Sequence, residues 1–194
     1  MSAALPERTM PDRVKIGVGL FLFSEAWFFL ILVITYAFFH SRSADGPSAA
    51  NSLNVTHTLV FSICLFLSSA TIHMASRSFR AGDRSGVSGW LALTVALGAI
   101  FLFGQTREYL GLFAHSVTIS TNLFGSTFFT LTGFHGLHVL MGLVALIALL
   151  GIALSGRQSA IQPSGFESVA MYWHFVDAVW VVIFTVVYIW PLIG

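Results

Sequence analysis

The chain has 194 residues, of which 56% are hydrophobic and only 9% are charged, and its mean hydropathy is +0.85. Because a soluble domain carries about 25% charged residues, this chain has too little polar surface to cover a water-facing globule. Its net charge of +1 says little about partners, and no basic run indicates nucleic acid as one. The composition is that of an integral membrane protein, and we expect one membrane domain over residues 1–194.

The first predicted element follows a short polar lead with three basic residues. An apolar run of more than twenty residues, 16–39, is interrupted only by Ser24 and Glu25. This run is longer than the apolar region of a secretory signal, and no cleavage-like site follows it. We therefore expect it to be retained as the first membrane helix.

Four further apolar runs follow, and all five runs have about 20 residues or more, as a hydrocarbon core of about 30 Å requires. No alternating pattern of about ten residues indicates membrane strands. The fourth run is too long for the bilayer, so its helix must tilt, project or begin later. The sequence thus predicts an all-α bundle of five transmembrane helices. The four later runs cover residues 55–74, 89–109, 123–154 and 168–193.

The distribution of lysine and arginine predicts the orientation. Seven of these residues lie in the N-terminal lead and the loops 75–88 and 155–167, whereas Arg42 and Arg107 alone lie on the opposite side. Positively charged loops remain in the cytoplasm. The N-terminus is therefore predicted to be cytoplasmic and the C-terminus to lie outside.

The first, fourth and fifth runs contain five acidic or histidine residues. At about 1.5 Å per residue, the carboxylate in the first helix and the one in the fifth lie about 14 and 13 Å from the cytoplasmic end. Two histidines of the fourth helix lie about 18 and 22 Å from the outer end by the same measure. All five side chains are thus expected in one band in the inner half of the membrane. They are Glu25, His135, His138, His174 and Asp177.

Two interpretations of this band stay open on the residues alone. An acidic residue at the bilayer centre costs about 2.5–3.5 kcal/mol, so such groups usually face the bundle and find partners. In the first interpretation, Glu25 and Asp177 hydrogen-bond histidines across helices and fix the packing. In the second, Glu25, which has no basic neighbour in the sequence, exchanges protons with the cytoplasm.

The histidines do not have the spacing of a metal or haem centre. His135 and His138 share one helix face about 5–6 Å apart, too close to hold two stacked haems. His57 and His73 lie near opposite ends of the second run, and Cys64 is the only cysteine. No arrangement typical of a serine or cysteine nucleophile is present either. We therefore expect neither a metal nor a catalytic residue in this chain.

Aromatic and small residues predict how the helices pack. Trp90, Trp173 and Trp190 lie near the ends of the predicted helices and are expected to be interfacial anchors. Thr132 and Gly136 form a pair of small residues four apart, a spacing that favours close helix contact. The fourth helix is therefore expected to be central to the bundle.

Four segments resemble one family. GSTFFTLTGFHGLHVLMG (Gly125–Gly142) resembles the signature segment of subunit III of haem–copper oxidases. SEAWFFLILVITYAFFH (Ser24–His40) resembles the family's glutamate-bearing helix, and Gly165–Trp190 resembles its last helix. Gly98–Leu112 resembles the end of a middle helix. The motif residues in these segments include Gln105, Glu108, Tyr109 and Trp173.

The resemblance implies an accessory subunit that packs directly on oxidase subunit I, with subunit II in the same complex. Haems and copper in the partner subunits reduce oxygen to water, and subunit I pumps protons. This chain would carry no redox cofactor and would be part of an enzyme only as a non-catalytic subunit. Glu25 matches the family's reactive intramembrane carboxylate, which is associated with proton uptake and turnover stability. The family also binds phospholipid in a cleft between helices.

The chain lacks two N-terminal helices of the mitochondrial form and matches the five-helix form of bacterial oxidases, which implies a bacterial cytoplasmic membrane. Both cytochrome c and quinol oxidases have this form, and a larger respiratory supercomplex is compatible with it. One alternative is the subunit III-like component found with nitric oxide reductases. A stand-alone proton or solute transporter using Glu25 and Asp177 is another, although the loops are short and no inverted repeat is present. A membrane cytochrome b is disfavoured by the histidine spacing.

Overall fold

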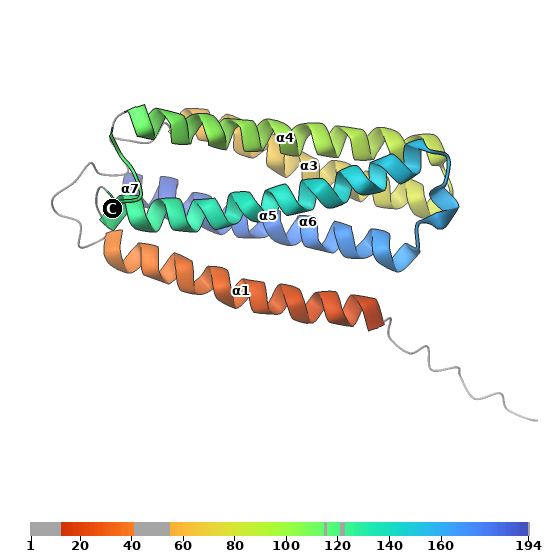
Figure 1. Cartoon of the computed structure of the whole chain (residues 1–194), viewed down its shortest axis with the longest axis horizontal. Coiled ribbons are helices and arrows are strands. Elements are labelled where there is room, and N and C mark those ends of the chain that lie inside the picture. Colours follow the sequence, from red (N-terminus) through yellow and green to blue (C-terminus); the bar gives the residue numbers. More distant parts are fainter. Residues whose placement is uncertain (1–12, 41–54, 115, 121–122, 194) are drawn as a thin grey trace, which may run out of the picture.

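Five long helices make up most of the part of the chain that the structure describes (Figure 1). The computed structural model describes residues 13–40, 55–114, 116–120 and 123–193, and these ranges contain no strand. All five helices are long and apolar enough to cross a membrane, which confirms the predicted all-α membrane bundle. The helices are α1 (Arg13–His40), α3 (Val55–Ala81), α4 (Arg84–Ala114), α5 (Leu123–Leu154) and α6 (Pro163–Phe184).

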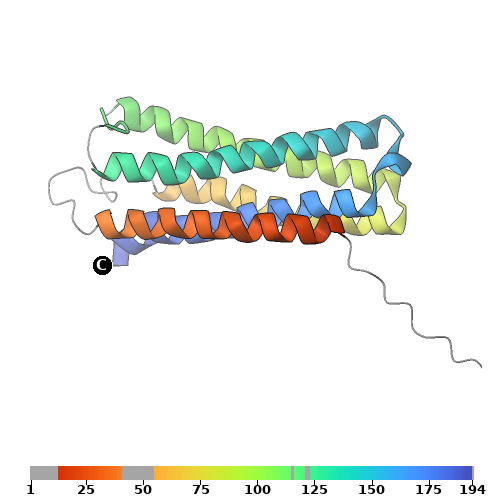
Figure 2. The same cartoon turned by 60° about the horizontal axis from the view of Figure 1, so that its bottom comes forward.

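The helices run antiparallel in chain order, and two of them form the centre of the bundle (Figures 1 and 2). Helices α3 and α4 pair along their length, and α1 lies on the other side of the molecule against α5 and α6. Helix α5 packs on α1, α4 and α6, as expected for a central helix. Helix α6 shares this position because it contacts α1, α3 and α5.

The connection between α3 and α4 is much shorter than the sequence predicted. Residues 75–88 were expected to form a loop, but α3 continues to Ala81 and α4 begins at Arg84. Gly82 has a φ of +72°, which a glycine adopts without steric cost. The Asp83 carboxylate accepts a hydrogen bond of 3.0 Å from the Gly86 amide and so caps the start of α4. The polar composition marks where the chain leaves the membrane, not where the helix ends.

Other helices also extend further than the sequence predicted. Helix α4 extends beyond residue 109 to Ala114, and α6 begins at Pro163 instead of residue 168. A proline suits the first turn of a helix because the amide that it lacks has no partner there. Helix α5 is one continuous helix of 32 residues from Leu123, so the alternative of a later start is wrong. At about 1.5 Å per residue it is about 48 Å long and must project beyond the hydrocarbon core.

The last helical stretch continues through Pro191 to Ile193, where the predicted fifth run also ends. After α6 the chain forms a π-helical turn, η2 (Thr185–Ile189), and then a last short helix, α7 (Trp190–Ile193). The Trp190 amide donates to the Thr185 carbonyl five residues earlier. Proline lacks an amide hydrogen and normally disturbs a helix. Here the wider turn just before Pro191 lets the helix continue through it.

Charged side chains join three helices at one end of the bundle. Lys15 of α1 forms an ion pair with Glu167 of α6, and Arg80 of α3 lies 3.9 Å from the same carboxylate. At the same end, the Gln158 amide donates to the Arg84 carbonyl over 2.9 Å. We call this the charged end, and it is the end predicted to face the cytoplasm.

The centre of the bundle is built around Trp173 of α6, which is fully buried. Its indole Nε1 donates to the Ser68 hydroxyl of α3 over 2.9 Å. The ring lies against two glycines: a Cβ added to Gly98 of α4 would be 2.8 Å from it, and one added to Gly142 of α5 would be 2.7 Å away. One indole therefore holds four helices together.

The prediction that Trp173 is an interfacial anchor is wrong. Trp90 and Trp190, by contrast, are 38% and 44% exposed near helix ends, as expected of anchors. Trp173 was assigned to the interface because the fifth helix was expected to begin at residue 168. Since α6 begins at Pro163, Trp173 lies almost three turns inside the helix.

We predict that Gly142→Ala destabilises the protein by about 1–3 kcal/mol, because its new methyl group would overlap the buried and hydrogen-bonded Trp173 ring. Gly151→Ala on the same helix is the matched control. Apart from its chain neighbours and its own helix backbone, no atom lies within 4 Å of its added Cβ, and alanine improves helix propensity. Thermal unfolding in detergent should show a lower Tm for the first variant only. Equal Tm values for the two variants would contradict the proposed contact.

Candidate functional site: intramembrane acidic networks

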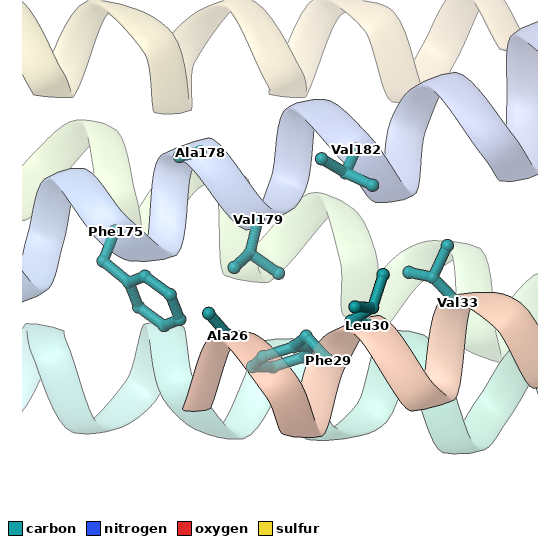
Figure 3. A pocket seen from close by; sticks show the side chains of 8 residues that line it. All are labelled: Ala26, Phe29, Leu30, Val33, Phe175, Ala178, Val179 and Val182. Carbon is teal, nitrogen blue, oxygen red and sulfur yellow. The ribbon is translucent and has the colours of Figure 1, made fainter. Parts of the chain in front are cut away.

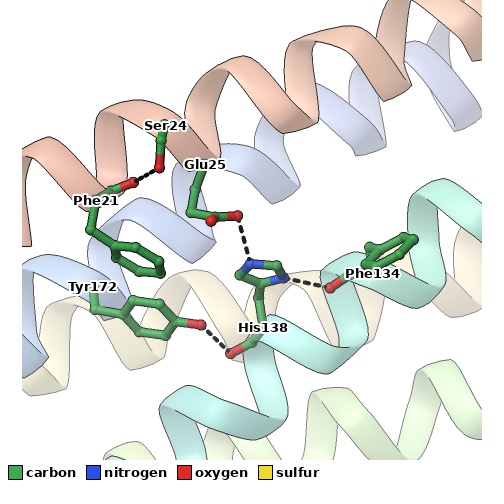
Figure 4. A network of polar contacts seen from close by, with 6 residues as sticks. All are labelled: Phe21, Ser24, Glu25, Phe134, His138 and Tyr172. Carbon is green, nitrogen blue, oxygen red and sulfur yellow. Dashed lines mark hydrogen bonds and ion pairs between the residues drawn. The ribbon is translucent and has the colours of Figure 1, made fainter.

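Glu25 of α1 and His138 of α5 meet across the helix interface (Figure 4). The carboxylate Oε2 lies 3.1 Å from the imidazole Nε2. The side chains are 21% and 7% exposed. Of the two histidines on the signature helix, His138 is therefore the one that contacts the glutamate.

The hydrogen bonds of His138 determine how many protons the pair holds. Its Nδ1 lies 2.7 Å from the Phe134 carbonyl, which can only accept, so Nδ1 must carry a hydrogen. A hydrogen bond between Nε2 and Oε2 then needs one more proton between the two atoms. This proton belongs either to a neutral glutamic acid or to an imidazolium facing a carboxylate. The geometry thus holds one proton that can pass from one residue to the other without a rearrangement of the helices.

Aromatic side chains hold the pair in place. The Tyr172 hydroxyl of α6 donates to the His138 carbonyl over 3.1 Å, as Figure 4 shows. The Phe29 ring meets the His138 ring edge-on, with centroids 4.9 Å apart. The pair is therefore supported from α1, α5 and α6 together.

Two apolar grooves lie beside Glu25 on α1. One, of about 240 Å³, lies between α1 and α6 (Figure 3). The other, of about 380 Å³, lies between α1, α5 and α6 and includes Tyr172. Ala26 lines the first groove and Phe21 the second, so the glutamate lies between them along the helix. Side chains in both grooves are almost entirely apolar, and this lining suits hydrocarbon better than water.

Asp177 belongs to a separate network. The Ser69 hydroxyl of α3 donates to Asp177 Oδ2, and the same hydroxyl lies 2.9 Å from His174 Nδ1. The sequence interpretation that Asp177 hydrogen-bonds a histidine is wrong in this detail, because the serine is its partner and connects it to His174. Ser69 lies in an apolar run and was not singled out from the sequence.

His135 has no hydrogen bond within the part of the chain that the structure describes, although it is fully buried. Its ring is stacked on Trp180, with centroids 4.8 Å apart, and meets Phe101 edge-on at 6.0 Å. The expectation that it joins an interhelical polar network is therefore wrong. Residues three apart differ by about 60° around a helix, so His138 meets α1 while His135 lies against α4 and α6.

Glu108 of α4 forms a third acidic network, on the side away from the charged end. It accepts hydrogen bonds from the Thr58 hydroxyl of α3 at 2.8 Å and the Tyr188 hydroxyl of η2 at 2.7 Å. The sequence identified Glu108 only as a motif residue at a helix end. The π turn, which sequence reasoning did not detect, contains the tyrosine that reaches it.

The other motif residues connect α4 to α5. The Gln105 amide donates to the Thr132 carbonyl over 2.7 Å, and the Tyr109 and Thr132 hydroxyls lie 2.7 Å apart. A Cβ on Gly136 would lie 3.2 Å from the Gln105 amide. The small pair Thr132 and Gly136 therefore makes room for a side chain of α4.

Short hydroxyl side chains provide contacts that sequence reasoning missed. The Trp180 indole donates to the Ser62 hydroxyl over 2.8 Å, and the Thr71 and Thr94 hydroxyls lie 2.8 Å apart. Serine and threonine are frequent in membrane helices, where many bond only to their own backbone. Nothing in the sequence therefore separates these residues from the others.

The described residues contain no group of three or more histidine, cysteine, aspartate or glutamate side chains that could hold a metal ion. The absence of a cofactor from this chain remains a prediction.

Comparison with known proteins agrees with this architecture. Residues 6–192 match the family described as Cytochrome c oxidase subunit III. The chain belongs to the cytochrome c oxidase subunit III family. It is 37% identical to "Cytochrome c oxidase subunit 3" of Corynebacterium diphtheriae, over 95% of this chain and 94% of the relative. It is 40% identical to the protein of that name in Synechocystis, over 92% and 76%. "Probable cytochrome c oxidase subunit 3" of Mycobacterium leprae is 36% identical, over 92% and 88%.

We predict that Tyr188→Phe lowers the free energy of unfolding by about 1–2 kcal/mol, because one oxygen of the half-buried Glu108 loses its donor. Tyr172→Phe is the control. It also removes a tyrosine hydroxyl, but the carbonyl that it leaves keeps its helical hydrogen bond. Denaturant unfolding in detergent should show the larger loss for Tyr188→Phe. An equal loss of unfolding free energy in the control would show that the hydrogen bond to Glu108 does not contribute more to stability than that of Tyr172.

Proposed function

We propose that this chain is the subunit III of a respiratory haem–copper terminal oxidase in a bacterial cytoplasmic membrane. Family membership over residues 6–192 supports this assignment, and the named relatives include several bacterial proteins. The chain packs directly on subunit I, in a complex that also contains subunit II. Oxygen reduction takes place at haem and copper centres in the partner subunits, and this chain has no catalytic residue of its own.

The observation that carries a functional role beyond assembly is the contact between Glu25 and His138, whose geometry needs one proton between the two side chains. Glu25 lies ten residues after Lys15 of the charged end, or about 15 Å along the helix. A carboxyl group at this depth is expensive to bury unless it has a function or a partner. In our proposal the pair exchanges protons with the cytoplasmic side and supports proton uptake by subunit I and its stability during turnover.

Bound phospholipid is the second part of the proposal. The two apolar grooves beside Glu25 have the lining that an acyl chain requires, and residues of α1 line both. The charged end places two cations, Lys15 and Arg80, around the single carboxylate of Glu167, and the excess positive charge suits a lipid phosphate. A lipid in either groove would keep water away from the side of the pair that faces the membrane.

Purification tests the assignment itself. The detergent-purified complex that contains this chain should show haem absorption and a subunit list with a haem–copper subunit. Haem should be missing from the chain when it is expressed alone. Recovery of the chain without a haem-containing subunit, or with a nitric oxide reductase, would overturn the proposal.

The role of Glu25 is tested by Glu25→Gln. A glutamine amide can still donate to Nε2 of a neutral imidazole, so we expect the complex to assemble normally. Because an amide does not exchange its proton as a carboxyl does, proton uptake should slow, or the active lifetime during turnover should shorten, by about two- to tenfold. Proton uptake and turnover lifetime are measured together with subunit stoichiometry.

Glu167→Gln is the matched control, because it changes a carboxylate at the charged end that is not part of the pair. It should leave both quantities close to those of the native complex. Unchanged uptake and lifetime in Glu25→Gln would leave Glu25 with a packing role alone.

A further inference from the structure

Two exposed histidines lie on the joint surface of α3 and α6, beside the half-buried Ser69 and the buried Asp177. His73 and His174 are both exposed, and Ser69 and Asp177 lie next to them. We call these four residues the α3–α6 polar patch. It is separate from the Glu25–His138 pair, which lies between α1 and α5.

The patch lies within the membrane. Glu167 of the charged end is seven residues before His174 and ten before Asp177, which places them about 10 and 15 Å deeper along α6. Hydrocarbon cannot satisfy hydrogen-bonding groups at that depth, so polar side chains there face protein or a water-filled space. In this chain, however, His73 and His174 are exposed on the outer surface of the helix bundle, where they would otherwise face lipid.

The hydrogen bonds of the patch define what its partner must offer. The Ser69 hydroxyl has one hydrogen and donates it to Asp177. The contact of 2.9 Å to His174 must therefore use a hydrogen on Nδ1, with the serine oxygen as the acceptor. In the neutral ring, Nε2 then carries a lone pair. No group in the described ranges bonds to this nitrogen or to the ring nitrogens of His73.

We propose that the α3–α6 polar patch is a docking surface for a transmembrane helix of another oxidase subunit, which donates a hydrogen bond to Nε2 of His174. Ala70 of α3, next to Ser69 of the patch, is exposed, and its small side chain lets a helix approach closely. This inference rests on the proposed function, because it needs an oxidase complex to supply the helix.

Photo-crosslinking in the intact complex tests the contact. A photoreactive amino acid is placed at Ala70, and in a second chain at Val181 of α6, which is 50% exposed. The control position is Val144 of α5, which is 60% exposed on another face. We expect crosslinks from Ala70 and Val181 to one identified oxidase subunit, at a yield several times that from Val144. Crosslinks only to lipid, only to a second copy of this chain, or mainly from Val144 would overturn the proposal.

Substitution provides the second measurement. If the histidines faced lipid, the double variant His73→Leu and His174→Leu would fit the bilayer better and would leave association unchanged. If they dock a helix, loss of the hydrogen bond should weaken association by about three- to tenfold. The fraction of the chain that co-elutes with the complex over a detergent series measures this. Val144→Leu is the control and should co-elute as the native chain does.

The outcomes separate this inference from the proposed function. A native chain that co-elutes with a haem–copper subunit, while the double histidine variant co-elutes equally well, would overturn the docking surface and leave the proposed function standing. A native chain that co-elutes with no oxidase subunit would overturn both.

Discussion

The cost of placing a carboxyl group in hydrocarbon is the constraint on which the rest of this structure depends. Glu25, Glu108 and Asp177 each lie within an apolar helix, and each is hydrogen-bonded to a residue from a different helix. Glutamate has no partner along its own apolar segment, so burial of the carboxyl forces two helices into one register. The three networks link α1 to α5, α3 to α4 and η2, and α3 to α6.

The three networks differ in what their chemistry allows. Glu108 accepts hydrogen bonds from the hydroxyls of Thr58 and Tyr188. A hydroxyl does not readily give up its proton to a carboxylate, so this network has no proton to exchange. Asp177 accepts from a serine that is in turn fixed by His174. In the Glu25–His138 pair, either partner can hold the shared proton, because the second imidazole nitrogen is fixed by a backbone carbonyl. This difference in protonation chemistry separates a candidate proton site from two structural connections.

Close packing around large aromatic rings complements these polar contacts. Lipid tails are as apolar as leucine, so association of membrane helices depends on fit and on hydrogen bonds more than on the hydrophobic effect. Trp173 and Trp180 provide both, because each indole is buried among neighbouring helices and donates to a serine of α3. Glycines at positions 98 and 142 give Trp173 its space. The described part of the bundle is thus held from its centre by α6 and α5.

The sequence by itself determined the class of structure and the family. An apolar run must be helical to satisfy its backbone in a membrane, so five runs predicted five helices, and four local motifs were enough for the family resemblance. The sequence also predicts a band of acidic residues and histidines, because depth along a membrane helix follows from the rise per residue.

Only the tertiary structure decided which side chains meet. His135 and His138 are equivalent in the sequence, yet a rotation of about 60° puts one against Trp180 and the other against Glu25. The carboxylate networks also depend on contacts between residues that are 50 or more positions apart in the sequence. These contacts make Ser69, Thr58 and Tyr188 the partners of carboxylates. Hydropathy fixes how deep a residue lies but not which way it points around its helix. That direction is determined by the packing of all five helices together.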